Sequence, residues 1–552
     1  MPSQWAMTST PFPNQPPPYE GRNLYDTDTV LRQAVIREGA AYAIGALGAW
    51  GAELGRAETF VLADAANRHP PELRTHDRRG ERIDTVSFHP AWHALMQRAT
   101  SAGEHCAPWD VPGPGSQVAR AAMYFLHAQV ENGTQCPVTM TYASVPALRA
   151  SGGAVPGLNA TWLPRILAPA YDPRPLPVAA KRAALIGMGM TERQGGSDVR
   201  SNLTRAEPAG DGAYRITGHK WFFSAPQSDA HLVLAQAPQG LTCFLLPRIL
   251  DDGTRNAIRL TRLKDKLGNR SNASAEVEFD GALGWRVGDE GRGIATILTM
   301  VQHTRLDCVL GSAGIMRAGV ARALHHAKHR IAFGHALVQQ PLMAAVLADL
   351  ALESEAATAL ALRLARCYDA PEDGAEQALA RVATPAAKYW TCKRASALAA
   401  ESMEVLGGNG YAEENPLPRF YREAPVNSIW EGSGNVMCLD VLRALAREPA
   451  ARDALQVELE AARGADRRYD AYVAALAPAL AAAVDDARLA RRVAQSIALA
   501  LQGALLLRHA PPFVADAFCA SRLASDTPFA GAAFGTLPPT ADHAAIVARA
   551  AG

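Results

Sequence analysis

The sequence predicts a mainly α-helical protein with a central β domain and an added C-terminal helical domain. Helical apolar spacing fills the first part of the chain and returns after residue 291. Between these parts, short strand-like runs are punctuated by Gly and Pro. We therefore expect four units: an N-terminal arm and helical domain over 1–182, a central β domain over 183–290, a helical bundle domain over 291–448, and an appended helical domain over 449–552.

Length and composition set limits on function. A chain of 552 residues with 48% apolar content is large enough for several buried cores. Its 55 basic and 54 acidic side chains nearly cancel, which excludes a global attraction to nucleic acid or anionic membrane. Eight cysteines without CxxC spacing indicate reduced thiols, and the chain has neither a signal peptide nor an apolar run long enough to span a bilayer. We expect a cytoplasmic protein.

The N-terminal unit begins with a Pro-rich stretch from Pro11 to Pro18, which predicts an extended arm. Helical spacing follows over 28–62 and 91–130, and the polar segment from Asn67 to Pro90 between them is rich in turn residues. The first domain is therefore predicted to be helical.

The central unit changes to the period of β-strands. Asp211-Gly212 between two such runs predicts a tight hairpin. The predicted strands are 184–186, 214–217, 231–236, 242–246, 258–263 and 275–279.

Long Ala- and Leu-rich helices follow the β domain. Pro341 suits a first helical turn, and Gly407-Gly408 suits a helix end. The predicted bundle helices are 296–330, 341–368, 379–406 and 436–447, and Ala-rich helices resume after Pro449.

The most informative motif runs from Ser428 to Asn435 and sets Glu431 between Trp430 and a Gly-Ser-Gly turn. Burial against a Trp disfavours the ionised carboxylate and raises its pKa, while Gly432 permits close approach of a ligand. Such a carboxylate can act as a base, although an isolated Glu beside a Trp is more often a surface or ion-paired residue.

Two motifs in the β domain carry groups suited to a flat ligand. Residues 190–199 combine hydroxyls with Gly195-Gly196, whose backbone N–H groups can approach a ring or phosphate. Residues 218–224 contain three consecutive aromatics that end in a hydroxyl. Taken singly, a Gly-Gly turn and a core strand remain the alternatives.

Two helix ends could hold a diphosphate. Arg330 precedes Phe333-Gly334, and Gly407-Gly408 precedes Tyr411, which offers a guanidinium and bare backbone. Ordinary helix caps are the alternative. The chain has no GxGxxG or GxxxxGK[ST], and the pair His325 and His329 has no further ligand cluster, so no metal site is expected.

Taken together and in this order, these segments resemble the acyl-CoA dehydrogenase flavoprotein family. The family pattern of TE-xx-GSD, G-x-K-x-W-I-T-N, R-x-x-F-G, GG-x-GY and (Y/W)-E-G-(T/S) is matched in turn over 191–198, 218–225, 330–334, 407–411 and 430–433. The resemblance covers roughly residues 90–447. It implies that family's fold, with a helical N-terminal domain, a small β barrel or sandwich and a four-helix bundle.

The resemblance also implies roles for single residues. Glu431 matches the catalytic base and Arg305 an arginine near it, while Ser197 and Trp430 would contact an acyl-CoA thioester. Arg330, Phe333, Gly407 and Gly408 would reach the FAD of a neighbouring subunit, which implies a dimer or a dimer of dimers. The other residues implied to bind FAD are Met190, Thr191, Gly196, Phe222, Phe223, Ser224, Gly432, Ser433 and Asn435.

The chain departs from the family pattern at three positions. Glu404 stands where a Gln usually precedes the GG turn, Phe222 replaces the flavin-stacking Trp, and Ala225 replaces an Asn. An acid near a pyrophosphate is unfavourable, so the position of Glu404 bears on cofactor binding.

The N-terminal arm and the extra C-terminal helices resemble the alkylation-response (AidB) branch of the family. That resemblance implies a homotetrameric flavoprotein that binds double-stranded DNA through its added domain and has weak dehydrogenase activity. Arg488, Arg491 and Arg492 are predicted to share one helical face as a phosphate-binding patch. Because Asp485 and Asp486 lie beside them, a solvated helix face is the alternative.

Two functions follow from these resemblances. The first is an FAD-containing protein of this branch that binds DNA under alkylation stress and retains residual α,β-dehydrogenation of acyl-CoA thioesters. The alternative is a metabolic acyl-CoA dehydrogenase that passes electrons to an electron-transfer flavoprotein and has no DNA role.

Overall fold

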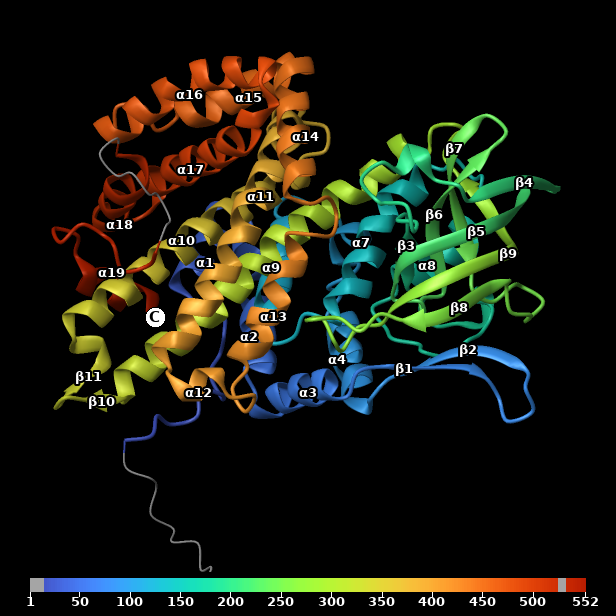
Figure 1. Ribbon diagram of the computed structural model, residues 1–552, viewed down its shortest axis with the longest axis horizontal. Coiled ribbons are helices and arrows are strands. Elements are labelled where there is room, and N and C mark those ends of the chain that lie inside the picture. Colours follow the sequence, from blue (N-terminus) through green and yellow to red (C-terminus); the bar gives the residue numbers. More distant parts are fainter. Residues whose placement is uncertain (1–13, 525–532) are drawn as a thin grey trace, which may run out of the picture.

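The computed structural model describes residues 14–524 and 533–552, in which long helices form the centre of the molecule (Figure 1). The β domain lies at one end of this bundle, and the C-terminal helices pack on the other side. Residues 11–13 of the predicted N-terminal arm lie outside the described residues. The predicted fold class, mainly α with a central β domain, is confirmed.

The N-terminal domain contains one element that sequence reasoning missed. The polar segment predicted to be turn-rich is an antiparallel hairpin of β1 (Glu72–His76) and β2 (Arg82–Ser87). Leu73 and Val86 of this hairpin pack against the core of the β domain. The segment was missed because two apolar residues are too few to give a recognisable strand period. The helices are α1 (Thr29–Arg37), α2 (Ile44–Leu54), α3 (Ala57–Arg68), α4 (Pro90–Ser101), α5 (Ala107–Asp110), α6 (Ser116–Ala128), α7 (Gln135–Arg149) and α8 (Leu163–Ile166).

The β domain is a seven-stranded sheet that closes on itself. Its strand order is β3-β5-β4-β6-β7-β9-β8, and the further pairings β3–β6 and β5–β9 join its two parts. The hairpin predicted at Asp211-Gly212 is confirmed, since both residues have the positive φ that a two-residue turn requires. The strands are β3 (Ile186–Gly189), β4 (Arg205–Gly210), β5 (Ala213–Ser224), β6 (Ala230–Ala237), β7 (Gly240–Pro247), β8 (Ile258–Leu263) and β9 (Ser274–Val287).

The bundle is built around one helix, α9 (Gly293–His329), which packs against helices of the N-terminal domain and of the bundle itself. Because α9 is buried on all sides over most of its length, it carries apolar residues all round rather than on one stripe. The other bundle helices are α10 (Pro341–Asp369), α11 (Gly374–Val405), α12 (Gly408–Tyr411), α13 (Leu417–Asn427) and α14 (Gly434–Arg447). A short hairpin of β10 (Ile331–Ala332) and β11 (His335–Ala336) follows α9.

The C-terminal helices share the core of the bundle. Ile497 and Leu501 of α17 belong to the same apolar cluster as Leu310 of α9. A buried ion pair between Arg522 and Glu353, 3.0 Å from Nη2 to Oε2, adds a second link. The described C-terminal helices are α15 (Pro449–Glu460), α16 (Arg467–Asp485), α17 (Ala490–His509), α18 (Pro512–Phe518) and α19 (His543–Ala550).

All eight cysteines are buried and unpaired, as their spacing predicted. Among the described residues, no helix combines the length and the apolar character needed to cross a membrane.

Candidate active site

The predicted base lies in a loop between α13 and α14 that a buried lysine holds in place. Glu431 has φ of +58°, in the left-handed region that a non-glycine residue rarely occupies. Lys388 of α11 extends its Nζ into the loop and donates to the carbonyl oxygens of Asn427, Trp430 and Gly432 at 3.0, 2.9 and 2.8 Å. The unusual backbone at Glu431 is therefore fixed by contacts on both sides of it.

The carboxylate of Glu431 is held by one hydrogen bond and is otherwise poorly solvated. Thr304 of α9 donates through Oγ1 to Oε2 at 2.5 Å. Burial raises the pKa of Glu431, and the Thr304 hydrogen bond and the charges of Lys388 and Arg305 oppose that rise. The result is a carboxylate whose other oxygen, Oε1, has no hydrogen bond to the described residues.

The side chain of Arg305 supports the base loop by binding to the backbone of that loop. Its Nε donates to the carbonyl oxygen of Glu431 at 3.1 Å, and its Nη1 pairs with Asp440 of α14 at 2.8 Å. The guanidinium thus ties the loop to both α9 and α14.

Sequence reasoning missed Thr304 and Lys388. Thr304 directly precedes Arg305, which had been singled out, but nothing in the sequence shows that its hydroxyl points at Glu431. Lys388 did leave a signal: a single cation between Ala386-Ala387 and Tyr389-Trp390 in an apolar helix is unexpected unless it is buried with partners.

The β domain approaches this loop from the other side. Met190 and Trp430 both pack against one apolar cluster, which joins the strand motif to the base motif. The carbonyl of Thr191 accepts from the backbone N–H of Trp221 at 2.8 Å. A Cβ at Gly196 would come within 2.3 Å of Thr191 Oγ1, so only glycine allows this loop to fold so closely on itself. Ser197, beside it, is exposed.

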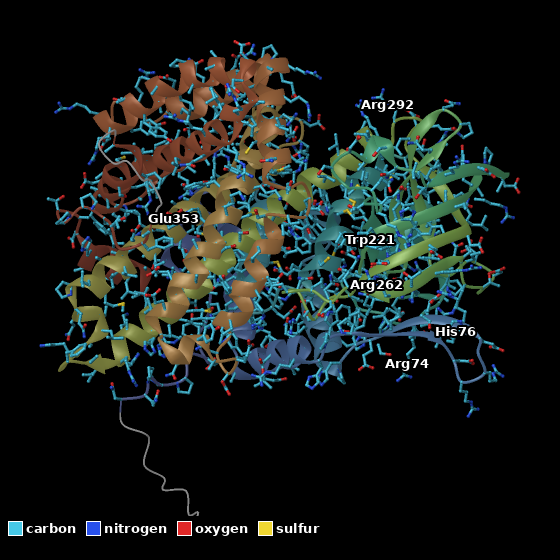
Figure 2. The ribbon with its side chains drawn as sticks, viewed as in Figure 1. Arg74, His76, Trp221, Arg262, Arg292 and Glu353 are labelled. Atoms are coloured by element: carbon cyan, nitrogen blue, oxygen red, sulfur yellow. The ribbon has the colours of Figure 1, made fainter. Side chains whose placement is uncertain are left out.

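The three consecutive aromatics of β5 do not share one face. The Phe222 side chain is 52% exposed, and Lys264 Nζ lies 4.7 Å from its ring centroid. Phe223 is fully buried and stacks on His231, so it belongs to the core of the β domain rather than to the face of Phe222. Trp221 lies beside Arg262 and beneath Lys264, whose Nζ is 3.6 Å from the indole centroid (Figure 2).

The turn after the base begins α14. Gly432 has φ of +102°, Ser433 is the N-cap residue, and Asn435 is exposed. Asn435 Oδ1 accepts from Arg491 Nε of α17 at 2.8 Å. An arginine predicted to contact DNA therefore lies against a residue predicted to bind FAD.

The second set of predicted cofactor residues lies at the far end of the bundle. Arg330 follows Arg305 by 25 residues in and just after α9, which separates them by roughly 37 Å along the helix axis. Phe333 is 95% exposed with φ of +51°, and Gly407 and Gly408 are exposed. Glu404 is exposed as well. Within one chain, these predicted cofactor residues therefore do not lie beside Glu431.

The predicted arginine patch of the C-terminal domain is not one helical face. Arg488 lies in a 3-10 turn over Ala487–Leu489, before α17 begins at Ala490, and its guanidinium pairs with Asp486 at 2.8 Å. Only Arg491 and Arg492 lie in α17, because Arg488 belongs to the 3-10 turn that Asp486 caps ahead of this helix. Arg491 and Arg492 are exposed.

A long helical bundle, a small closed β domain and a poorly solvated carboxylate between them define the fold and site of an acyl-CoA dehydrogenase. Three sequence families match the chain: "Adaptive response protein AidB N-terminal domain" over 14–173, "Acyl-CoA dehydrogenase, middle domain" over 187–282, and "Acyl-CoA dehydrogenase, C-terminal domain" over 291–446. The "Putative acyl-CoA dehydrogenase AidB" of Escherichia coli is 52% identical over 93% of this chain and 94% of its own length.

Solved structures agree with the sequence matches. Caenorhabditis elegans ACDH-11 in complex with C11-CoA has a TM-score of 0.84 and 28% identity, and the match covers 94% of each chain. A Bacillus anthracis acyl-CoA dehydrogenase complexed with FAD shares the fold, with a TM-score of 0.62 at 18% identity over 78% of this chain and 80% of its own. The chain belongs to the acyl-CoA dehydrogenase family, in its AidB branch, and is an FAD-dependent oxidoreductase of that type.

The residues present suit the family's cofactor. Phe222 presents an exposed aromatic ring on the same strand as the half-buried hydroxyl of Ser224. The glycine-rich backbone at Gly196 lies on the loop that follows Met190 and Thr191. Flat apolar surface, bare backbone and hydroxyls are the groups that a flavin ring needs.

We expect Lys388→Met to free the base loop. The substitution leaves one buried and two partly buried carbonyl oxygens without their donor, which should lower the free energy of unfolding by about 3 kcal/mol. Amide hydrogen exchange over 427–432 should accelerate more than in the rest of the bundle. Lys393→Met, which removes an exposed ammonium from the same helix, is the control. Unchanged exchange in this loop would show that Lys388 does not hold it.

Proposed function

We propose that this protein catalyses the α,β-dehydrogenation of acyl-CoA thioesters, with Glu431 as the base that removes the α-proton. The observation that carries the proposal is the state of that side chain: a carboxylate of raised pKa, in a strained backbone conformation, with one oxygen held and the other free. Strained residues with perturbed pKa values cluster at functional sites. The C11-CoA complex of the C. elegans relative supports this class of substrate.

The chain's own residues have separate tasks in this reaction. Glu431 Oε1 accepts the α-proton, while Thr304 fixes the orientation of the carboxylate through Oε2. Trp430 and Met190 exclude water from the reacting carbons. Met190, Thr191, Gly196, Phe222 and Ser224 would hold the cofactor ring. FAD, when bound, accepts the hydride from the β-carbon.

A homo-oligomer, built as a dimer of dimers, is part of the proposal. Along α9, Arg330 is about 37 Å from the level of Arg305, which contacts the Glu431 loop, so we expect this set to reach the cofactor of a second copy of the chain. The exposed ring of Phe333 is accessible for such a contact. Sedimentation equilibrium of the holoprotein measures the assembly directly.

The test of the catalytic proposal is a panel of acyl-CoA thioesters mixed with the purified holoprotein. We expect the visible absorbance of the oxidised flavin to bleach with at least one thioester. An added electron-transfer flavoprotein should restore the absorbance if it is the electron acceptor. A holoprotein that no thioester bleaches would overturn the proposal.

A second prediction, beyond the dehydrogenase activity, is that the C-terminal domain binds duplex DNA during alkylation stress in the cytoplasm. Its support is the match to an adaptive-response family and the exposed Arg491 and Arg492. Ion pairing reduces the charge available: Asp486 pairs with Arg488, and Glu276 pairs with both Arg262 and Lys264.

We expect few phosphate contacts and therefore a shallow salt dependence. Each phosphate that the protein neutralises contributes a slope of about −0.9 to a plot of log K against log[salt]. Replacing both Arg491 and Arg492 with Ala should make this slope less negative by about 2, as measured by fluorescence-anisotropy titrations with duplex DNA at several salt concentrations. Arg463→Ala, whose guanidinium already pairs with Glu460, is the control. Absence of salt-dependent binding would leave only the dehydrogenase function.

A further inference from the structure

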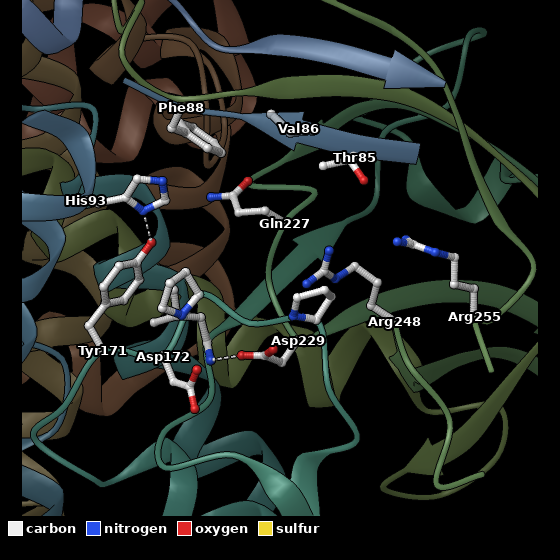
Figure 3. A pocket seen from close by; sticks show the side chains of 13 residues that line it. Thr85, Val86, Phe88, His93, Tyr171, Asp172, Gln227, Asp229, Arg248 and Arg255 are labelled. Atoms are coloured by element: carbon white, nitrogen blue, oxygen red, sulfur yellow. Dashed lines mark hydrogen bonds between the residues drawn. The ribbon is translucent and has the colours of Figure 1, made fainter. Parts of the chain in front are cut away.

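A cavity lies away from the base loop, between the β1–β2 hairpin, α4 and the β domain. Its volume is about 90 Å³, several times the 10–15 Å³ that one water molecule needs. Figure 3 shows His93 and Tyr171 on one side of it and the guanidinium groups of Arg248 and Arg255 on the other, with Gln227 reaching toward the space between them. None of the residues predicted to bind FAD or acyl-CoA lines this cavity.

The cavity carries an excess of positive charge. Its two carboxylates already have partners: Asp229 pairs with Lys181 at 2.6 Å, and Asp172 pairs with Arg174 at 2.7 Å. By contrast, neither guanidinium in the cavity makes a side-chain hydrogen bond or ion pair within the described part of the chain, and Arg248 Nε is buried. Burial lowers the pKa of Arg248, the charge of Asp229 opposes that shift, and the charge of Arg255 adds to it. An arginine so placed favours an anion beside it.

The amide of Gln227 restricts which ligand can bind in the cavity. Both Nε2 and Oε1 of its amide are buried and have no partner among the described residues. Leaving a buried donor and acceptor unpaired costs about 1–3 kcal/mol each. A ligand that satisfies both must offer an acceptor and, next to it, an O–H or N–H donor.

The opposite wall is aromatic and rigid. The phenol of Tyr171 and Nδ1 of His93 form a hydrogen bond of 2.8 Å, and Phe88 stacks on Trp92 with ring centroids 4.0 Å apart. Such a wall suits the hydrocarbon part of a small ligand.

From these contacts we propose that the cavity is a binding site for a small 2-hydroxycarboxylate. Its carboxylate would accept from Arg248, Arg255 and the Gln227 amide nitrogen, and its hydroxyl would donate to Gln227 Oε1. The hydrocarbon part would lie against Phe88 and Tyr171. Because β2, α4 and the residues just before β6 and just after β7 border the cavity, the bound ligand would join the N-terminal domain to the β domain.

The test compares three probes by isothermal titration calorimetry of the holoprotein at constant ionic strength: lactate, acetate and lactamide. Lactate should bind at least about tenfold more tightly than acetate, because acetate leaves Gln227 Oε1 unpaired. Lactamide, which lacks the charge, should not bind measurably. Equal affinity for lactate and acetate, binding of lactamide, or no saturable binding of lactate would each overturn the proposal.

Variants locate the site. Arg248→Met should weaken lactate binding more than about tenfold, and Gln227→Leu should reduce lactate to the affinity of acetate. If Arg248→Met does not fold, Gln227→Leu and the comparison of the three probes still test whether lactate binds in this cavity. Arg259→Met removes an exposed cation paired with Asp280 and should change nothing. Glu431→Gln should bind lactate normally; weakened binding there would place lactate at the base loop instead.

Discussion

Replacing Glu431 with Gln should abolish acyl-CoA-dependent bleaching of the flavin while the protein keeps its cofactor and its fold. The amide has nearly the same shape, so Thr304 can still donate to its oxygen, but it cannot accept the α-proton. Loss of a general base costs about 10²–10⁴-fold in rate, and we expect the upper part of this range because, within residues 14–524 and 533–552, no other carboxylate bonds to Thr304. Stopped-flow absorbance with a reactive thioester measures the effect.

The pH dependence of the same reaction identifies the titrating group. Only the ionised carboxylate can accept a proton, so the wild-type rate should rise with pH as Glu431 deprotonates. Because burial raises the pKa of Glu431, this rise should occur above the pH at which an ordinary glutamate titrates. Any residual rate of Glu431→Gln should lack this step.

Glu372→Gln is the matched control, since it changes an exposed carboxylate in the turn between α10 and α11 by the same substitution. It should bleach at the wild-type rate. A Glu431→Gln variant that bleaches normally would show that another group removes the proton.

Among the substitutions proposed for this protein, Arg120→Met should cause the largest decrease in the free energy of unfolding. Arg120 of α6 and Asp307 of α9 are both buried, and Nη2 donates to Oδ2 at 2.8 Å. Thr139 also donates to this carboxylate. Removing one partner of a buried ion pair costs about 3–5 kcal/mol, because the other charge stays buried without compensation. Thermal and denaturant unfolding should show the loss.

The pH response of this variant has a definite sign. Burial already raises the pKa of Asp307, and Arg120 opposes the rise. Without Arg120, the folded-state pKa of Asp307 should rise further above its unfolded value. The folded variant then binds more protons, so its stability should fall as the pH rises from the unfolded pKa toward the folded one.

A second substitution separates loss of the pair from loss of packing. Arg120→Met/Asp307→Leu removes both charges and should recover most of the stability. Arg56→Met breaks an exposed pair with Glu53 and should cost less than about 1 kcal/mol. If the double variant is as unstable as the single one, the ion pair is not the cause.

Much of the architecture could be predicted because periodicity and turn chemistry are local. The Asp211-Gly212 hairpin, the strands from β5 to β9 and the helices α9, α10, α11 and α14 all agree with their sequence patterns. The β1–β2 hairpin could not be found, since its few apolar side chains become meaningful only against the β domain. The position of Arg488 outside α17 was missed, because the 3-10 turn that carries it leads directly into that helix.

By itself, the sequence determined the fold class, the family and the position of Glu431 as a candidate base, because motif spacing and residue type are local properties of the chain. Tertiary structure alone decided what surrounds that carboxylate. Thr304 and Lys388 are 127 and 43 residues away from Glu431 along the chain, and they meet it only because α9, α11 and α13 pack together. It also decided that Phe223 faces the core while Phe222 is exposed, and that Arg330 lies far from Glu431, since burial and distance are properties of the packed molecule.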